Sequence, residues 1–262
     1  MTAARHIHAD CQGSGLRLVL LHGWTMRGAV MAPLAAALPG FACVAPDLPG
    51  HGRTTGYAAD LPGAVAMLDD LLADGLPTVL VGWSLGALVG WQWLAAHGPG
   101  PVHGMVSLDM SPRPLPEAGW NYPMSGQSAD RIRARAGWFR DSWPSAVAPL
   151  AAGIFATDAG APVFDAAQAQ AVIAAQDGAV MAGFWSSLVE ADCRAAIGRL
   201  PVPLLAIHGE ESRVYPPACA DWLAAAAPRG TALRIPGAGH APHLERTAET
   251  AAAIAAFARQ VA

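Results

Sequence analysis

The chain contains no lysine, and its sixteen basic residues are all arginine. Charged residues make up only 14% of its 262 residues and the net charge is −4, which argues against a nucleic-acid partner. Together with abundant alanine, glycine and proline, the missing lysine indicates a GC-rich genome rather than a function. No apolar run is long enough to span a membrane, and residues 1–10 lack the apolar segment of a signal peptide. We therefore expect a cytoplasmic protein without a membrane partner.

Cysteine is scarce and scattered. The four cysteines form no C-x-x-C pair, which argues against disulfides and against a metal site: Cys11, Cys43, Cys193 and Cys219. Hydrophobic residues, in contrast, make up 53% of the chain, enough to build a large core. The length fits one α/β domain with an insertion, or two small domains.

Short apolar runs alternate with helical patterns in the first part of the chain. The expected strands cover residues 16–21, 41–45, 78–82 and 102–108, and the expected helices cover residues 29–38, 61–74 and 85–96. This alternation predicts an α/β fold with a mostly parallel, doubly wound sheet and helices on both faces. In such sheets the chemistry gathers at the carboxyl ends of the strands.

The pattern changes after Asp109, where three prolines interrupt the chain. No convincing strand is visible from residue 128 to about residue 199, and helices are expected at residues 129–141, 144–155, 165–176 and 178–189. Strands at 202–207 and 232–235, with helices at 221–227 and 248–261, then resume the alternation. We therefore expect a core formed by residues 1–111 and 200–262, and a helical cap formed by residues 112–199 and inserted after the sixth strand.

Gly82-Trp83-Ser84-Leu85-Gly86 is the most informative stretch of the sequence. It fits the pattern G-x-S-x-G and lies between an expected strand and an expected helix, the context that a nucleophile elbow requires. A turn this tight exposes the hydroxyl of Ser84 above the sheet and turns the helix N-terminus toward a developing oxyanion. We therefore predict that Ser84 is a nucleophile rather than a structural turn residue.

The predicted base is His240, because it follows the last expected strand on a glycine-rich loop, in the chain order serine, acid, histidine. His243 is a weaker candidate, since it falls inside the following helical turn. Two backbone N–H groups would form the oxyanion hole. One belongs to Leu85, directly after the serine, and the other to Trp24, directly after the first parallel strand.

The acid is less directly predicted. Folds with this elbow commonly place it after the next-to-last strand in a pattern such as G-x-x-D, but this chain has Ser212 at that position. A serine cannot stabilise an imidazolium as a carboxylate does. Asp109, after the strand that follows the nucleophile strand, is the favoured acid, and Glu211 is the alternative. A weakened serine–histidine pair, or another acid, is a third interpretation.

At these residues the chain resembles the α/β-hydrolase superfamily along nearly its whole length. The matching segments are Leu21-His22-Gly23-Trp24, Asp47-Leu48-Pro49-Gly50-His51-Gly52-Arg53, Gly82-Trp83-Ser84-Leu85-Gly86, Ile207-His208-Gly209 and Gly239-His240-Ala241-Pro242. Within the superfamily, the first and third segments look like the pimeloyl-acyl-carrier-protein methyl ester esterases of biotin synthesis. The resemblance implies a serine carboxylesterase with a helical cap and no cofactor. It also implies Ser84 and His240 as nucleophile and base, with Trp24 and Leu85 at the oxyanion hole.

The chain departs from that family at Ser212, where the family carries its aspartate. Asp109 instead resembles the arrangement in haloalkane dehalogenases. Those enzymes use an aspartate nucleophile, so Ser84 argues against dehalogenase and epoxide hydrolase chemistry.

Four arginines crowd one segment of the expected cap: Arg131, Arg133, Arg135 and Arg140. Acyl carrier proteins are acidic, and basic patches steer acidic partners. Two interpretations are open, a contact surface for a carrier protein and a solvated helix face.

The sequence therefore predicts a serine carboxylesterase that acts on a small-molecule ester, free or bound to an acyl carrier protein. A perhydrolase, haloperoxidase-like or lactonase activity on the same residues is an alternative. A ligand-binding protein with a weakened triad is an alternative of another class, motivated by Ser212.

Overall fold

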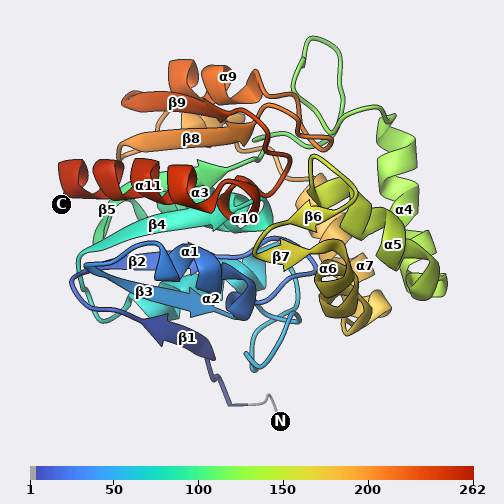
Figure 1. Cartoon of the computed structure of the whole chain (residues 1–262), viewed down its shortest axis with the longest axis horizontal. Helices are drawn as coiled ribbons and strands as arrows, with labels where there is room; N and C mark the ends of the chain where they lie inside the picture. Colours follow the sequence, from blue (N-terminus) through green and yellow to red (C-terminus); the bar gives the residue numbers. More distant parts are fainter. Residues whose placement is uncertain (1–3) are drawn as a thin grey trace.

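A seven-stranded sheet forms the centre of the computed structural model, which describes residues 4–262 (Figure 1). Its strands are β1 Ala9–Gln12, β2 Leu16–Leu21, β3 Phe41–Pro46, β4 Thr78–Trp83, β5 Val102–Leu108, β8 Leu204–Gly209 and β9 Gly230–Ile235. They lie in the order β1-β3-β2-β4-β5-β8-β9. Only the edge pair β1 and β3 is antiparallel, and all other neighbours in this sheet are parallel. The predicted mostly parallel sheet is confirmed.

Helices cover both faces of this sheet (Figure 1). On one face, α1 Ala32–Ala36 packs with α10 Pro242–Glu245 and α11 Thr247–Val261. On the other, α2 Leu61–Leu72 packs with α3 Leu85–His97. α9 Cys219–Ala226 packs on β8 and β9. The order of β2, β3 and β4 explains why helices lie on both faces, because the chain moves in one direction along the sheet from β2 to β3 and in the other from β3 to β4. Right-handed crossovers in opposite directions place their helices on opposite sides of a sheet.

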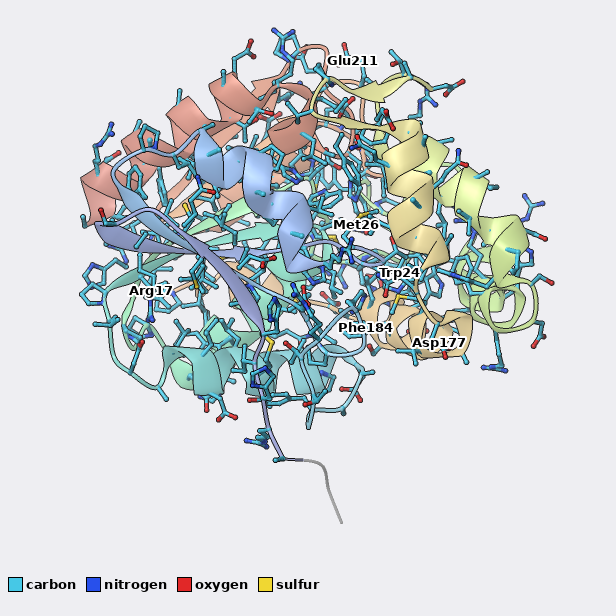
Figure 2. The ribbon with its side chains drawn as sticks, turned by 60° about the horizontal axis from the view of Figure 1, so that its bottom comes forward. Arg17, Trp24, Met26, Asp177, Phe184 and Glu211 are labelled. Carbon is cyan, nitrogen blue, oxygen red and sulfur yellow. The ribbon has the colours of Figure 1, made fainter. Side chains whose placement is uncertain are left out.

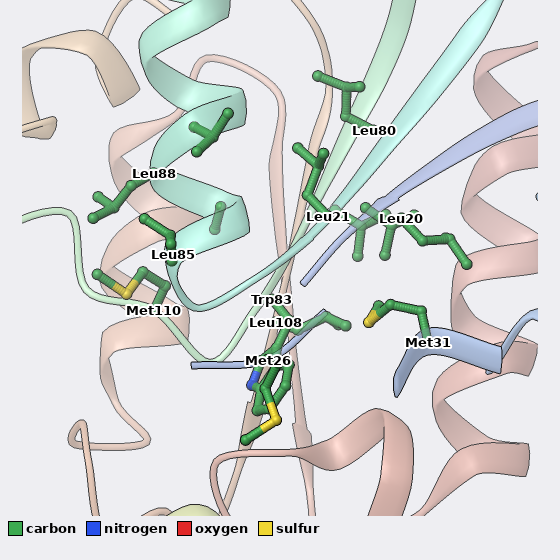
Figure 3. Close-up of a cluster of buried hydrophobic side chains, with 14 of the residues drawn as sticks. Leu20, Leu21, Met26, Met31, Leu80, Trp83, Leu85, Leu88, Leu108 and Met110 are labelled. Atoms are coloured by element: carbon green, nitrogen blue, oxygen red, sulfur yellow. The ribbon is translucent and has the colours of Figure 1, made fainter. Parts of the chain in front are cut away.

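The inner strands β2, β3, β4, β5 and β8 are mostly apolar and buried because both of their faces are covered, whereas the edge strands β1 and β9 are largely exposed. Leu18 through Leu21 of β2 have no solvent exposure. Figure 3 shows side chains on either side of the central strands, with Leu88 and Met110 beside α3 and Met31 beside α1. This packing fixes the strand ends from which the candidate site is built.

Five helices separate β5 from β8: α4 Ala129–Asp141, α5 Trp143–Ile154, α6 Ala166–Ala174, α7 Gly178–Val189 and α8 Arg194–Ile197. The short hairpin of β6 Gly160–Ala161 and β7 Phe164–Asp165 lies between α5 and α6. Helices α4 to α7 gather beyond the carboxyl ends of the parallel strands (Figure 1). Side-chain caps set their starts, since Ser128 accepts a hydrogen bond from Arg131 N and Asp177 accepts one from Ala179 N.

The structure differs from the sequence-based expectation in several details. The helical insertion follows the fifth strand of the chain rather than a sixth, because the described residues ahead of β2 form the single strand β1. The expected helix at 29–38 begins as a 3₁₀ turn over Gly28–Met31 before α1, since Pro33 favours a helix start and lacks an N–H. The strand β1 and the hairpin β6–β7 were not expected, because such short or exposed strands carry no clear apolar alternation.

No single helix among residues 4–262 is long and apolar enough to cross a membrane, and α6 and α7 reach that length only as a pair bent by 101°. All four cysteines are free thiols. Across the same residues, no three histidine, cysteine, aspartate or glutamate side chains gather as a metal site.

Candidate active site

A sharp turn between β4 and α3 carries Ser84. Its backbone has φ 52° and ψ −114°, and its N–H donates to the carbonyl oxygen of Leu108 at 2.9 Å. The turn requires glycine on both sides of the serine. A Cβ on Gly82 would clash with the backbone of Gly86, and a Cβ on Gly86 would clash with the carbonyl oxygen of Leu21. This is the strand–turn–helix arrangement that the G-x-S-x-G pattern requires.

Backbone strain concentrates at this end of the sheet. Among the described residues, three that are not glycine have positive φ: Thr25 at 70°, Ser84 at 52° and Asp109 at 45°. A β-branched residue such as Thr25 rarely adopts this conformation. Such strain persists only where the surrounding structure enforces it, and it clusters at functional sites.

His240 lies on the loop that follows β9. Its Nδ1 is 2.7 Å from Oδ1 of Asp109. Because an ionised carboxylate only accepts hydrogen bonds, Nδ1 carries the proton and Nε2 is left as the basic nitrogen. The loop is held in place by Trp83, whose Nε1 donates to the carbonyl oxygen of His240 at 2.7 Å.

Asp109 lies at the end of β5 with no solvent exposure. Besides the bond to His240, its Oδ1 accepts a hydrogen bond from the Ser212 hydroxyl at 2.8 Å, and its Oδ2 accepts one from Gly209 N at 3.1 Å. The backbone N–H of Asp109 donates to the carbonyl oxygen of Ile207 on β8 at 2.8 Å. A buried carboxylate is costly unless it is hydrogen-bonded, so these contacts stabilise it where it orients His240.

Two other sequence candidates lie apart from this pair. The carboxylate of Glu211 accepts a hydrogen bond from Gly237 N at 2.9 Å, and Glu211 is exposed at the rim of the molecule (Figure 2). His243 is fully buried, and its ring packs against Trp83 with centroids 4.6 Å apart. Burial lowers the pKa of His243 to about 3, so its ring is neutral. The structure therefore brings Asp109, and not Glu211, to His240.

Trp24 and Leu85 present the two backbone N–H groups predicted for an oxyanion hole. In the part of the chain that the structure describes, neither N–H donates a hydrogen bond. The Trp24 indole faces the helical insertion (Figure 2), where Nε1 donates to the carbonyl oxygen of Met181 at 3.2 Å. Its ring packs against Phe139 and Trp185, with centroid distances of 5.0 and 4.8 Å. Both N–H groups therefore have no hydrogen-bond partner among the described residues.

His22 fixes the loop that carries Trp24. Its Nδ1–H donates to the carbonyl oxygen of Gly23 at 2.8 Å, and its Nε2 accepts the N–H of Leu48 at 2.9 Å. Burial lowers the pKa of His22 to about 4, which keeps the ring neutral with one donor and one acceptor. A protonated ring could not accept the Leu48 N–H.

A cavity of about 240 Å³ opens between the core and the helical insertion, with Ser84 and His240 in its wall. Most of its other lining is apolar, and the insertion contributes side chains such as Leu150, Ile154 and Leu188. The remaining wall also contains the polar side chains of Thr25, Gln127, Arg135, Arg213 and Tyr215. The cavity can therefore hold an apolar acyl chain beside a serine hydroxyl.

The hydroxyl of Ser84 contacts Met110 Sδ at 3.9 Å, and within the described residues it makes no hydrogen bond to His240. Sulfur is a weak acceptor, so the hydroxyl can rotate away at little cost. Nucleophile–base contacts are often long in ligand-free sites and tighten when substrate binds. The hydroxyl hydrogen must therefore turn from Met110 Sδ to His240 before His240 can take the proton.

The four arginines of the predicted carrier-contact segment have different surroundings on α4. Arg133 pairs with Glu190 at 2.6 Å. Arg135 is half-buried and lines the cavity, and with Arg131 it also lines a surface hollow next to the cavity. Burial and the nearby Arg131 lower the pKa of Arg135. Arg140 is exposed.

Glu245 is a residue that sequence reasoning missed. Its Oε2 accepts the N–H of Gly239, next to His240, at 2.7 Å. Its Oε1 accepts the N–H of Ala156, just after α5, at 2.7 Å. One carboxylate thus joins the histidine loop to the helical insertion. Burial raises the pKa of Glu245, while the N–H donors act in the opposite direction. The sequence does place an acidic residue five positions after His240. The residue whose N–H it accepts, Ala156, is distant in sequence, so the contact could not be foreseen.

His208 was also missed as a neighbour of the acid. It is fully buried on β8, and its Nδ1 lies 3.6 Å from Oδ2 of Asp109, beyond hydrogen-bond range. Burial lowers the pKa of His208, so the ring is neutral. It packs beside the carboxylate without neutralising it.

Comparison with known proteins agrees with this geometry. Residues 18–253 match the model of the alpha/beta hydrolase family. The chain is 30% identical, over 95% of its own length and 97% of the other, to a pimeloyl-[acyl-carrier protein] methyl ester esterase from Chromobacterium violaceum. Its fold is similar to that of an esterase (EaEST) from Exiguobacterium antarcticum, at a TM-score of 0.88 and 18% identity over 97% and 96% of the two chains. A bromoperoxidase from Bacillus anthracis gives the same TM-score and identity over 98% and 96%.

Proposed function

The chain belongs to the α/β hydrolase family, and on that premise we propose that it is a serine carboxylesterase. The observation that carries the proposal is the 2.7 Å hydrogen bond between His240 Nδ1 and Asp109 Oδ1, next to a cavity with Ser84 in its wall. A carboxylate-paired imidazole beside a serine elbow is the arrangement that activates a hydroxyl. It speaks against a ligand-binding protein with a weakened triad.

In the proposed mechanism, the Ser84 hydroxyl turns from Met110 to His240 and attacks the ester carbonyl carbon, while its proton passes to His240 Nε2. Asp109 stabilises the resulting imidazolium. The N–H groups of Trp24 and Leu85 donate to the tetrahedral oxyanion. His240 then gives the proton to the departing alcohol oxygen as the carbon–oxygen bond breaks, which leaves an acyl-enzyme. Water, deprotonated by His240, attacks the acyl-enzyme and releases the acid and Ser84.

Two observations support an acyl methyl ester as substrate. The apolar cavity walls suit an acyl chain, and the roof of helices suits a small alcohol as the leaving group. The relative from Chromobacterium violaceum, similar over nearly its whole length, is named for the methyl ester of a carrier-bound acyl chain. We propose that the substrate is a methyl ester of an acyl chain, free or bound to an acyl carrier protein, and that the reaction belongs to biotin biosynthesis.

A fluorophosphonate probe tests the chemistry without assuming a substrate. We expect the wild type to be labelled covalently, with the label mapped by peptide mass spectrometry to Ser84. The same preparation should hydrolyse short acyl esters faster than it hydrolyses lactones or forms peracids with hydrogen peroxide. The reverse order of rates would favour the perhydrolase or lactonase alternatives. No labelling, combined with tight ligand binding and no turnover, would contradict the esterase.

The surface hollow beside the cavity supports a role for arginine in carrier binding. We expect Arg131→Gln to lower kcat/KM for a methyl ester carried by an acyl carrier protein by about 10-fold, because a positive charge that steers an acidic partner is lost. The variant should hydrolyse the corresponding free methyl ester at the wild-type rate. Arg199→Gln is the matched control. This exposed arginine lies near the amino end of β8, whereas the cavity lies at the carboxyl ends of the strands. An equal effect of both variants, or equal losses with both substrates, would contradict carrier binding at the hollow.

A further inference from the structure

The hydroxyl of Ser212 is part of the acid site although it is not an acid. Its Oγ lies 2.8 Å from Asp109 Oδ1, the oxygen that also binds His240 Nδ1 at 2.7 Å. Ser212 occupies the position where the sequence pattern predicts the acid itself. Residue 212 therefore contacts the acid of the candidate site, while the carboxylate itself comes from the end of β5.

The direction of this hydrogen bond is fixed by its surroundings. Oγ of Ser212 is approached by the backbone N–H groups of Val214 and Tyr215, both at 3.4 Å. These donors occupy its lone-pair side, and an ionised carboxylate can only accept. The hydroxyl hydrogen of Ser212 is therefore directed at Asp109. Tyr215 is buried and lines the cavity, so the same turn joins the acid to the cavity wall.

We infer that Ser212 is a positioning residue that holds the Asp109 carboxylate in the orientation that His240 requires, an inference that rests on the proposed esterase function. The carboxylate has two further restraints, the N–H of Gly209 on Oδ2 and His240 itself on Oδ1. His208 adds no hydrogen bond, because its Nδ1 is 3.6 Å away. Without the Ser212 hydroxyl, Oδ1 depends on His240 alone, and the carboxylate can rotate away as the imidazole moves during catalysis.

The same contact makes position 212 a second place from which an acid can reach His240. A carboxylate built at residue 212 would extend toward the space now filled by Asp109 Oδ1. Glycine is the suitable replacement at residue 109, since it empties that space and accepts the backbone φ of 45° without strain. Asp109→Gly combined with Ser212→Asp therefore moves the acid from the end of β5 to the loop after β8.

The first experiment compares Ser212→Ala with Ser212→Thr, which keeps the hydroxyl. We expect Ser212→Ala to lower kcat and the rate of fluorophosphonate labelling by about 10- to 100-fold, with KM unchanged, because one hydrogen bond to a charged group is lost. Ser212→Thr should keep most of the wild-type rate. A wild-type rate in Ser212→Ala, or an equal loss in both variants, would overturn the inference.

The second experiment compares Asp109→Gly with the double variant Asp109→Gly/Ser212→Asp, each checked for a cooperative thermal transition. We expect the double variant to label and turn over at least about 10-fold faster than Asp109→Gly, since a carboxylate again faces His240. Equal rates in two folded proteins would show that a carboxylate at residue 212 does not reach His240. That result would overturn the inference that residue 212 is a second place for the acid.

Failure of this inference and failure of the proposed function give different results. If the wild type is not labelled at Ser84, the esterase proposal fails, and with it the role of Ser212. If the wild type is labelled and Ser212→Ala is labelled equally fast, the esterase proposal stands and the positioning role alone is overturned.

Discussion

Ser84→Ala is expected to lower kcat for ester hydrolysis by about five to six orders of magnitude, the loss typical of removing a serine nucleophile. The other hydroxyl groups in the cavity wall, those of Thr25 and Tyr215, do not stand on the strained turn at φ 52° that carries residue 84. Substrate binding should persist, since the cavity walls are unchanged. Active-site titration and steady-state kinetics on a short acyl methyl ester measure the effect, and equilibrium binding of the product acid measures retention of the cavity.

Ser186→Ala is the matched control. This serine lies on the outer side of α7, where its hydroxyl bonds the carbonyl oxygen of Ala182 at 3.1 Å, so its loss should leave both rate and labelling unchanged. Residual hydrolysis by Ser84→Ala above about one hundredth of the wild-type rate would require another nucleophile and would contradict the acyl-enzyme mechanism. Labelling of Ser84→Ala as fast as the wild type would do the same.

Asp109→Asn is expected to lower kcat by about 10⁴-fold, the effect of the same change in a serine triad. Asparagine accepts a positive φ, so the backbone at 45° is tolerated and the shape is kept. The amide nitrogen can donate to His240 Nδ1, which favours the wrong tautomer, and the imidazolium loses its carboxylate. KM should change little, because Asp109 is fully buried and does not line the cavity. The pre-steady-state rate of acylation is the decisive measurement.

Glu211→Gln distinguishes the two candidate acids. If Asp109 is the acid, this change should alter kcat by less than about threefold, because a glutamine oxygen can still accept the N–H of Gly237. If the large loss appears in Glu211→Gln and Asp109→Asn keeps a near-normal rate, the acid assignment is wrong. Thermal unfolding of both variants separates an effect on chemistry from an effect on folding.

The fold was largely predictable because its inner strands are buried on both faces and are therefore mostly apolar. Leu18 through Leu21 and the run before Ser84 are unambiguous for this reason. The helices α4 and α7 begin and end at the predicted residues, because Ser128 and Asp177 cap them from their own local sequence. The exposed edge strand β1 carries no such pattern, and the start of α1 depends on the position of one proline.

In the candidate site too, local sequence predicts some residues, and others depend on contacts between distant segments. Ser84 and His240 follow from local motifs, and Asp109 follows from its residue type at a strand end. The donor role of Ser212 could not be foreseen, since it depends on where the loop after β8 passes relative to β5. From the sequence alone, a serine at an expected acid position indicates that the triad has lost its carboxylate there. The structure shows instead that its hydroxyl contacts the carboxylate that is present.

The two hydrogen bonds of Glu245 have a consequence for recombination between related proteins. A chimaera that exchanges residues 112–199 as a block would take Ala156 from one parent and Glu245 from the other, although these residues bond at 2.7 Å. A graft whose backbone offers no N–H at that point leaves one oxygen of a half-buried carboxylate without a partner, beside Gly239 and the histidine. An exchanged helical segment must therefore offer a backbone N–H to Glu245, a residue that lies outside that segment.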